Sequence, residues 1–439
     1  MIIFALKKLK RVLIITYYWP PAGGSAVYRW LKFTKYLKEF GWEPVIYTAE
    51  NGEYAEIDLS NEKDIPKDMK IIKQPIWEPY MFYKKFIGQK KTEKVNVGFL
   101  TERKKPKLAE KVAVWIRGNF FIPDARKFWI KPSVKYLTGY LKNNPVDAII
   151  SSGPPHSMHL IALQLKKKFH IPWVADFRDP WTNIDYYPEL LLTPFADRKH
   201  HRLEKSVVIM ADCVLTVGSK MTEEFQLMGA KRVETITNGF DTADYDEKPV
   251  SLDKEFTIAH FGTINKARNP QVLWEALIRL LKTNSELDKY LKLKFIGRLD
   301  TSVVSSLQET GLIKYLDKTD FIQHNEVVTK ERQSQILLLL INNTPNAEGI
   351  LTGKFFEYLA AKRPILAIGP TKGDVANILN DSKAGKIAGF NDADNIVSIL
   401  EEYFLNFMQG SLNVNTDNIN TYSRFELTRK LSGILNDIA

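Results

Sequence analysis

Residues 349–370 read GILTGKFFEYLAAKRPILAIGP, which predicts a loop, a short helix, a tight turn and a buried strand in succession. The run before it, QILLLLIN at 335–342, is too short to span a bilayer and is typical of a strand buried on both faces of a parallel sheet. We expect Thr352 and Gly353 to open the helix, since apolar residues then recur at spacings of three and four. Pro364 should end it, because proline cannot continue a helix.

Lys354 falls in the first turn of this predicted helix. A cation there opposes the helix dipole, which favours negative charge at its N-terminus, so the position indicates a bound anion. Glu357, one turn further on, would face the same ligand and accept hydrogen bonds from sugar hydroxyls. The alternative is that Lys354 and Glu357 form an ordinary surface pair at i and i+3.

A second cation precedes another predicted helix in the same half of the chain. The loop after the predicted strand 256–261 holds Thr263 and Arg268. Arg268 and Lys354 therefore show the same departure from the charge preference of helix starts, and one bound diphosphate would account for both. Arg298 follows the next predicted strand of this half.

The first half of the chain shows a similar alternation. The predicted strand 11–17 precedes a loop with Gly23 and Gly24, a helix, and the strand 44–48. Doubly wound sheets bind ligands at the carboxyl ends of their strands, so the glycines lie where a ligand would bind; alternatively, they only make the turn. Their spacing is not Gly-x-Gly-x-x-Gly, which disfavours a dehydrogenase.

Further polar candidates follow two later strands of this half. The strand 173–177 runs directly into Arg178 and Asp179, whose side chains would lie on the ligand rim or pair with each other. His156 and His159 flank a predicted helix start and are candidates for contacts near the reacting group. The alternative is a structural role, which is commoner for a lone histidine at such a position.

Length and composition exclude several classes of protein. The 439 residues are too many for one core and favour two domains, and the single cysteine, Cys213, excludes an internal disulfide. We expect no metal and no cofactor, because no metal-ligand motif is present and Asp392 and Asp394 fit a helix cap. We expect a cytoplasmic protein, because no apolar run has transmembrane length and the N-terminal apolar segment is too short for a signal peptide.

The net charge of +11 is concentrated at 82–142, where sixteen Lys and Arg stand against four Asp and Glu. Aromatic residues from Phe82 to Trp129 are interleaved with these cations. This combination predicts peripheral contact with an anionic membrane at its inner face; the alternative is a solvated basic face over an ordinary core. No nucleic-acid partner is expected, because no recognised nucleic-acid module is present.

The chain holds five motifs: PPAGG at 20–24, DFRDPW at 176–181, NGFD at 238–241, KARNP at 266–270 and GKFFEYLAA at 353–361. Taken together, they resemble family-4 (group 1) glycosyltransferases of the GT-B fold, in the subgroup with a DFRDPW-type motif in the first domain. The resemblance spans most of the chain. It implies two doubly wound, Rossmann-like parallel-sheet domains facing a central cleft.

The resemblance implies a retaining transfer of sugar from a UDP- or GDP-sugar donor, without a metal, to a glycan or lipid-linked acceptor of cell-surface polysaccharide biosynthesis. Arg268 and Lys354 would neutralise the leaving diphosphate, and Glu357 would hold the donor ribose. The implied donor site also takes in Gly23, Gly24, Thr263, Arg298, Thr352 and Gly353, and the catalytic candidates of the first domain are Arg178 and His156.

The chain departs from the family pattern at two positions. The first glutamate of the Glu-x7-Glu pair is replaced by Gly349, since Glu348 lies one residue too early, and Thr263 stands where the family usually has arginine. One alternative is a nucleotide-sugar epimerase or hydrolase, which shares the fold. The other is an inactive sugar-nucleotide-binding scaffold, which the missing first glutamate makes credible. The expected domains are 1–245 on the acceptor side, 246–415 on the donor side, and a C-terminal helix at 416–439 that packs back on the first domain.

Overall fold

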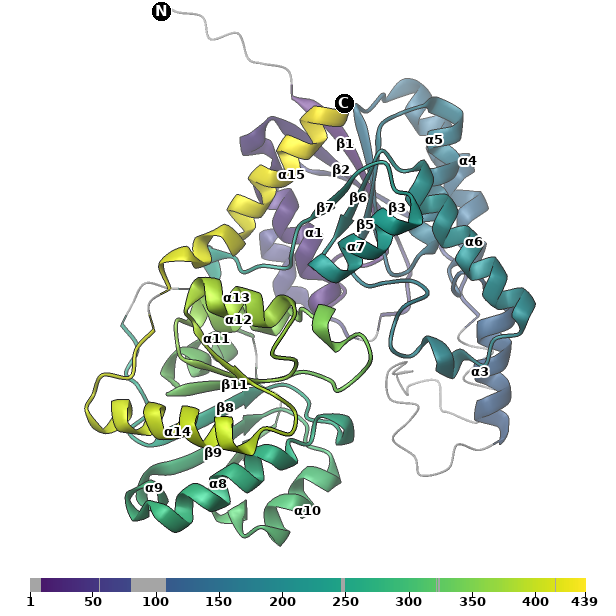
Figure 1. Cartoon of the computed structure of the whole chain (residues 1–439). Coiled ribbons are helices and arrows are strands. Elements are labelled where there is room, and N and C mark those ends of the chain that lie inside the picture. Colours follow the sequence, from purple (N-terminus) through teal and green to yellow (C-terminus); the bar gives the residue numbers. More distant parts are fainter. Residues whose placement is uncertain are drawn as a thin grey trace, which may run out of the picture. The chain divides into compact units, whose positions relative to one another are not determined.

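The computed structural model describes residues 9–54, 56–79, 108–245, 249–320, 322, 324–414 and 416–439. The chain divides into two compact units (Figure 1), one formed by Met1–Thr237 with Arg424–Ala439 and the other by Asn238–Ser423. The main stretch of the first unit thus ends at Thr237, before the expected boundary at 245. The part of the basic segment at 82–107 lies outside the described residues.

The first unit is built on a parallel sheet of seven described strands in the order β3-β2-β1-β4-β5-β6-β7. Alternate residues of β1 enter two cores: Leu13 and Ile15 pack with α4, α5, α6 and α7, whereas Val12 and Ile14 pack with α1 and α15. Helices therefore cover both faces of the sheet, as a doubly wound fold requires. The strands are β1 (Lys10–Ile15), β2 (Trp42–Ala49), β3 (Lys70–Gln74), β4 (Ala148–Gly153), β5 (Trp173–Phe177), β6 (Cys213–Thr216) and β7 (Val233–Thr235). The helices are α1 (Ser25–Tyr36), α3 (Leu108–Phe120), α4 (Lys127–Asn143), α5 (Ser157–Phe169), α6 (Pro194–Met210), α7 (Ser219–Met228) and α15 (Arg424–Ile438).

The second unit has a parallel sheet of six described strands in the order β10-β9-β8-β11-β12-β13. Its two cores again lie on opposite faces, one with α8, α9, α10 and α14, the other with α12 and α13. The strands are β8 (Phe256–Phe261), β9 (Leu291–Ile296), β10 (Leu316–Thr319), β11 (Ile336–Leu340), β12 (Ile365–Ile368) and β13 (Gly385–Ala388). The helices are α8 (Gln271–Thr283), α9 (Ser285–Tyr290), α10 (Thr301–Glu309), α11 (His324–Gln333), α12 (Gly353–Ala361), α13 (Asp374–Ser382) and α14 (Ala393–Met408).

The predicted fold class, two doubly wound parallel-sheet domains, is confirmed. Three local details differ from the sequence analysis. Helix α12 ends at Ala361, before Pro364 is reached, because the next residue, Lys362, has a left-handed φ of 54°. Pro270 favours the first position of a helix, but α8 starts one residue later, at Gln271. The expected C-terminal helix is preceded by a short 3-10 helix at Asp417–Tyr422.

The two ends of the second unit lie side by side. Phe240 and Ser423 form a parallel bridge, and the Phe240 amide donates to the Tyr422 carbonyl at 3.2 Å. The C-terminal helix α15 then belongs to the first unit, where it packs against α1.

Candidate functional site

In each sheet the direction in which strands are added reverses once, between β1 and β4 in the first unit and between β8 and β11 in the second. Open α/β sheets bind ligands beside the carboxyl ends of the strands at such a switch point. The loops after these four strands hold most of the candidate residues. The two switch points are therefore the places to look for a ligand site.

Lys354, in the first turn of α12, reaches the loop that follows β8. A Cβ built on Gly262 would lie only 2.5 Å from Lys354 Nζ, and Gly262 has a φ of +111°. The Gly262 amide donates to the Ile296 carbonyl at 2.7 Å, which ties this loop to β9. A residue without a side chain is thus required where the ammonium group lies.

Arg268 belongs to a one-turn 3-10 helix, Lys266–Arg268, which Asn265 caps by accepting a hydrogen bond from the Arg268 amide at 3.0 Å. It therefore precedes α8 by three residues and is not adjacent to the helix start as expected. Its Nε donates to Asn342 Oδ1 at 2.5 Å. Asn342 follows β11, so this bond joins the loops on both sides of the switch point.

Like charges meet in this site. Burial and the guanidinium of Arg268 lower the pKa of Lys354 to about 8, against the opposing effects of Glu357 and Glu331. In the described part of the chain, no residue forms a hydrogen bond or ion pair with the Lys354 ammonium. Beneath it, burial and the charge of Lys354 lower the pKa of His260 well below its ordinary value, so the imidazole is neutral. Two cations held together in this way favour a bound anion.

Glu357 lies one turn after Lys354 and is partly exposed. Its backbone carbonyl accepts a hydrogen bond from the Tyr245 hydroxyl at 3.2 Å, which fixes this turn of α12. The structure also brings Glu331 of α11 into the cluster, a residue that the sequence analysis missed because it sits in an ordinary amphipathic helix. The Tyr358 hydroxyl accepts from the Phe261 amide at 3.1 Å, which fastens α12 to the end of β8.

The remaining donor-side candidates lie around this cluster. Thr352 is the N-cap of α12 without a side-chain cap bond, and a Cβ on Gly353 would meet nothing within 4 Å. Thr263 follows Gly262 directly in the loop. Arg298 is exposed and follows the end of β9. Hydrogen bonds from Ser302 chiefly lower the pKa of Asp300, and the charge of Arg298 lowers it further. It is not among the groups that perturb Lys354.

Gly23 and Gly24 lie at the switch point of the first unit, in the loop between β1 and α1. The Gly23 amide donates to the Glu56 carbonyl at 2.9 Å, and a Cβ on Gly23 would lie 3.1 Å from that of Asp58. Gly24 has a φ of +83° and lies near the Glu56 carboxylate. In this structure, acidic side chains therefore line the glycine loop.

His156 and Arg178 meet around Gly153, at the end of β4. A Cβ on Gly153 would lie 2.9 Å from His156 Nδ1 and 2.5 Å from His159 Nε2. Burial lowers the pKa of His156 well below its ordinary value and that of His159 to about 3, so both imidazoles are neutral. Arg178 donates to the carbonyl oxygens of Ala26 and Pro154. These groups can offer hydrogen bonds to a ligand, and only Arg178 brings charge.

Asp176, in the same motif, is structural. It is fully buried and accepts hydrogen bonds from Arg29 Nη2 at 2.8 Å, Trp30 Nε1 at 2.9 Å and Ser152 Oγ at 2.8 Å. Arg29 is fully buried as well and also donates to the Thr237 carbonyl at 2.9 Å. This ion pair fastens α1 to β5.

The first unit also has a surface of exposed aromatic rings and cations, here called the basic aromatic surface. Phe195, Phe120 and Trp77 are 68%, 60% and 55% exposed. The Lys127 ammonium donates to the Phe120 carbonyl at 2.6 Å, and burial and the charge of Lys199 lower the pKa of Lys127. We define this surface by Trp77, Trp115, Phe120, Lys127, Phe128, Phe195, Arg198, Lys199 and Arg202.

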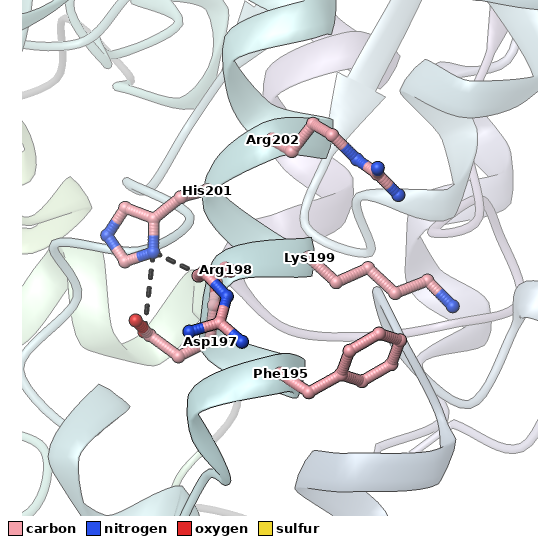
Figure 2. A pocket seen from close by; sticks show the side chains of 6 residues that line it. All are labelled: Phe195, Asp197, Arg198, Lys199, His201 and Arg202. Carbon is pink, nitrogen blue, oxygen red and sulfur yellow. Dashed lines mark hydrogen bonds and ion pairs between the residues drawn. The ribbon is translucent and has the colours of Figure 1, made fainter.

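A hollow of about 530 Å³ lies beside α6 within this surface, and Figure 2 shows Phe195, Lys199 and Arg202 extending to the same side of the helix. Among the residues that line the hollow, Asp197 is the one with a carboxylate. Asp197 Oδ1 lies 3.3 Å from His201 Nδ1 and accepts a hydrogen bond from the Tyr187 hydroxyl at 2.9 Å. Among the described residues, none forms an ion pair with Lys199 or Arg202. The hollow therefore has an excess of positive charge.

Comparison with known proteins adds a family to this geometry. Residues 90–244 match the model of Glycosyltransferase Family 4. The match covers roughly a third of the chain and includes the DFRDPW segment and His156. Together with the GT-B architecture, it supports assignment of the chain as a glycosyltransferase.

Solved structures share the fold over nearly the whole chain at low identity. An N-terminal domain of trehalose-6-phosphate phosphatase from Candida albicans is 14% identical with a TM-score of 0.63, covering 99% of this chain and 98% of that one. A structure titled trehalose-6-phosphate from E. coli, bound with UDP-2-fluoro glucose, is 12% identical with a TM-score of 0.60, covering 98% and 100%. WaaG, described as a glycosyltransferase involved in lipopolysaccharide biosynthesis, is 12% identical with a TM-score of 0.55, covering 97% and 99%.

No curated protein sequence matches the chain. Among the described residues, no helix is both long and apolar enough to cross a membrane. No group of three or more His, Cys, Asp or Glu in the described part of the chain is placed to hold a metal ion. The expectation that no metal or cofactor is used stays a prediction.

Proposed function

We propose that the chain transfers a sugar, with retention of anomeric configuration, from a nucleoside diphosphate donor bound at the switch point of the second unit. The observation that supports this most is the meeting of Lys354 and Arg268 beside the open N-terminus of α12. A diphosphate would neutralise both cations and accept hydrogen bonds from the unpaired amides of the first helical turn.

The same groups would assist the chemical step. Negative charge builds on the diphosphate as its bond to the sugar breaks, and cations held in place stabilise such a leaving group without reorganisation. Asn342 holds Arg268, and the Gly262 loop positions Lys354, so neither cation has to be recruited during the reaction. Glu357 would accept hydrogen bonds from the ribose hydroxyls. No metal is required in this scheme.

The basic aromatic surface suggests that the protein binds its acceptor at a membrane. Exposed aromatic rings beside lysine and arginine side chains suit the interface of an anionic membrane, where rings enter the headgroup layer and cations pair with phosphates. We therefore propose a peripheral enzyme at the inner face of a membrane that glycosylates a lipid-linked or glycan acceptor for a surface polysaccharide. The solvated basic face is the competing explanation.

A thermal-shift screen of UDP, GDP, ADP and their sugar conjugates tests the donor site. At about 100 times its dissociation constant, a ligand should stabilise the fold by roughly 2.7 kcal/mol. We expect one base to raise the Tm of the wild type and to lose this effect in Glu357→Ala and Arg268→Ala. If no nucleotide shifts the wild type, an inactive scaffold becomes the better assignment. If the protein consumes the nucleotide-sugar without an acceptor, an epimerase or hydrolase becomes the better assignment.

A further inference from the structure

Glu331 of α11 is a buried carboxyl group without an evident structural purpose. Its side chain is fully buried, and neither carboxyl oxygen has a hydrogen-bond partner among the described residues. A carboxyl group buried in this way lowers stability, so an unpaired one is expected where it acts on a ligand or on a neighbouring functional group. Helix α11 packs against α12, which carries the proposed donor-site residues.

Four titratable groups interact electrostatically with Glu331. They are Lys354, Glu357 and Tyr358 of α12, and Tyr245 from the segment before β8. Burial and the negative charge of Glu357 raise the pKa of Glu331 well above its ordinary value, while Lys354 opposes this. Burial and the charge of Glu331 raise the pKa values of both phenols, so the tyrosines stay neutral. The groups of the cluster that can carry a charge near neutral pH are therefore Lys354 and the two carboxyls.

Two carboxyl groups that share one site do not both ionise readily, and the proton goes to the one that water cannot reach. Glu357 is partly exposed and Glu331 is not. We propose that Glu331 is the protonated member of a carboxyl pair and donates a hydrogen bond to Glu357 in the occupied site, which holds that carboxylate toward the hydroxyls of the donor nucleotide. Glu331 is thus a positioning residue, and this role rests on the proposed donor site.

The pair has a simple chemical purpose. Ribose hydroxyls donate hydrogen bonds, and an ionised carboxylate accepts them more strongly than a neutral acid. A neutral hydrogen-bond donor behind Glu357 fixes the orientation of the Glu357 carboxylate without placing a second negative charge near the diphosphate. Ionisation of Glu331 would reverse both effects, because it removes the donated proton and adds repulsion.

The test compares three forms of the full chain: the wild type, Glu331→Gln and Glu331→Leu. Calorimetry gives the Kd of the nucleotide that stabilises the wild type, between about pH 7 and about pH 9.5, and thermal unfolding gives the Tm of each form. The Glu331→Gln variant keeps a neutral hydrogen-bond donor at this position, so its Kd for the nucleotide at neutral pH should lie within about threefold of the wild-type value. Leu removes the donor and should raise Kd about tenfold or more without lowering Tm, because burying leucine carries no desolvation penalty.

The pH series separates positioning from packing. Above neutrality the wild type should lose affinity faster than Glu331→Gln, because only the wild type can ionise at this position, whereas Lys354 titrates in both. Equal Kd values for Leu and wild type, or a Gln variant as weak as the Leu variant, would overturn the inference while leaving the donor site standing. A wild type that binds no nucleotide would overturn the proposed function and the inference with it.

Discussion

The Lys354 ammonium lies against the α-carbon of Gly262, so closely that a methyl group there would come within 2.5 Å of Nζ. Lys354 is in the first turn of α12, which follows β11 along the chain. Gly262 directly follows β8, the strand on the other side of the switch point. The position of the cation is therefore set by a glycine that is remote in sequence. Substitution at this glycine should change ligand binding by displacing the cation.

Gly262→Ala should weaken nucleotide binding about tenfold or more, because the new methyl group displaces Lys354 from the anion. The φ of +111° also makes alanine unfavourable, so some loss of stability is expected. Gly311→Ala is the matched control, since Gly311 has a φ of +72° with nothing within 4 Å of the added Cβ. Calorimetry should find its Kd unchanged; a similar loss in both variants would assign the effect to backbone strain.

The affinity for the donor nucleotide should fall above about pH 8, the pKa of Lys354 in the free protein. A bound diphosphate raises that pKa, so the contribution of Lys354 to binding is complete below about pH 8 and is lost as the pH rises through the value in the complex. Kd measured across this range checks the expectation. Lys354→Met should bind weakly at every pH and lack this component of the slope; the same slope in both forms would contradict the assignment.

Removal of Arg268 should reduce turnover more than removal of its neighbour. Arg268→Ala takes away a cation that Asn342 holds in the site, so we expect kcat/KM to fall about 100-fold. Lys266 lies in the same 3-10 turn but is exposed, and Lys266→Ala should change kcat/KM less than about threefold. Steady-state rates with a saturating acceptor distinguish the two. Equal effects would mean that general charge, and not position, matters.

Sedimentation with anionic vesicles tests the basic aromatic surface. Lys199→Glu with Arg202→Glu should reduce the bound fraction several-fold at low salt, because about 1 kcal/mol of attraction is lost per cation near the surface. The control reverses the same number of charges at Lys167 and Lys168, exposed residues of α5, and should bind like the wild type. High salt should release every form. Binding that no variant alters would refute the assignment to this surface.

The buried pair of Arg29 and Asp176 should dominate the stability of the first unit. Asp176→Ala leaves a fully buried guanidinium without its carboxylate, which should lower the free energy of unfolding by about 3–5 kcal/mol. The double variant Arg29→Met with Asp176→Leu should be less destabilised than the single one. Urea unfolding followed by tryptophan fluorescence checks this, since Trp274 alone of the nine tryptophans lies in the second unit.

Hydrophobic patterning was enough to predict the architecture. The strands at Trp173–Phe177 and Phe256–Phe261 consist mostly of apolar or β-branched residues, and the structure has them at the predicted bounds. The predicted start of α12 was also correct. Its end was not, because a residue other than glycine, Lys362, adopts the left-handed conformation that closes the helix.

The partners within the site could not be read from the sequence. Asn342 and Glu331 lie in unrelated segments, and only the packing of the loop after β11 and of α11 brings them to Arg268 and Glu357. Neither carries a local signal, since an asparagine after a strand and a glutamate in a helix are ordinary. Similarly, the acidic segment near Gly23 and Gly24 becomes relevant only once the chain has folded.

The neighbouring positions of Phe240 and Ser423 have a practical consequence for handling this protein. The second unit is one uninterrupted polypeptide with adjacent ends, inserted into a first unit that is made from two pieces. A gene fragment for Asn238–Ser423 therefore keeps every residue of that unit in one piece. A fragment ending at Thr237 lacks α15, so the apolar surface of α1 that packs against α15 is left exposed to solvent. Fragments for spectroscopy should be cut accordingly, with a short linker replacing the insert when the first half is wanted by itself.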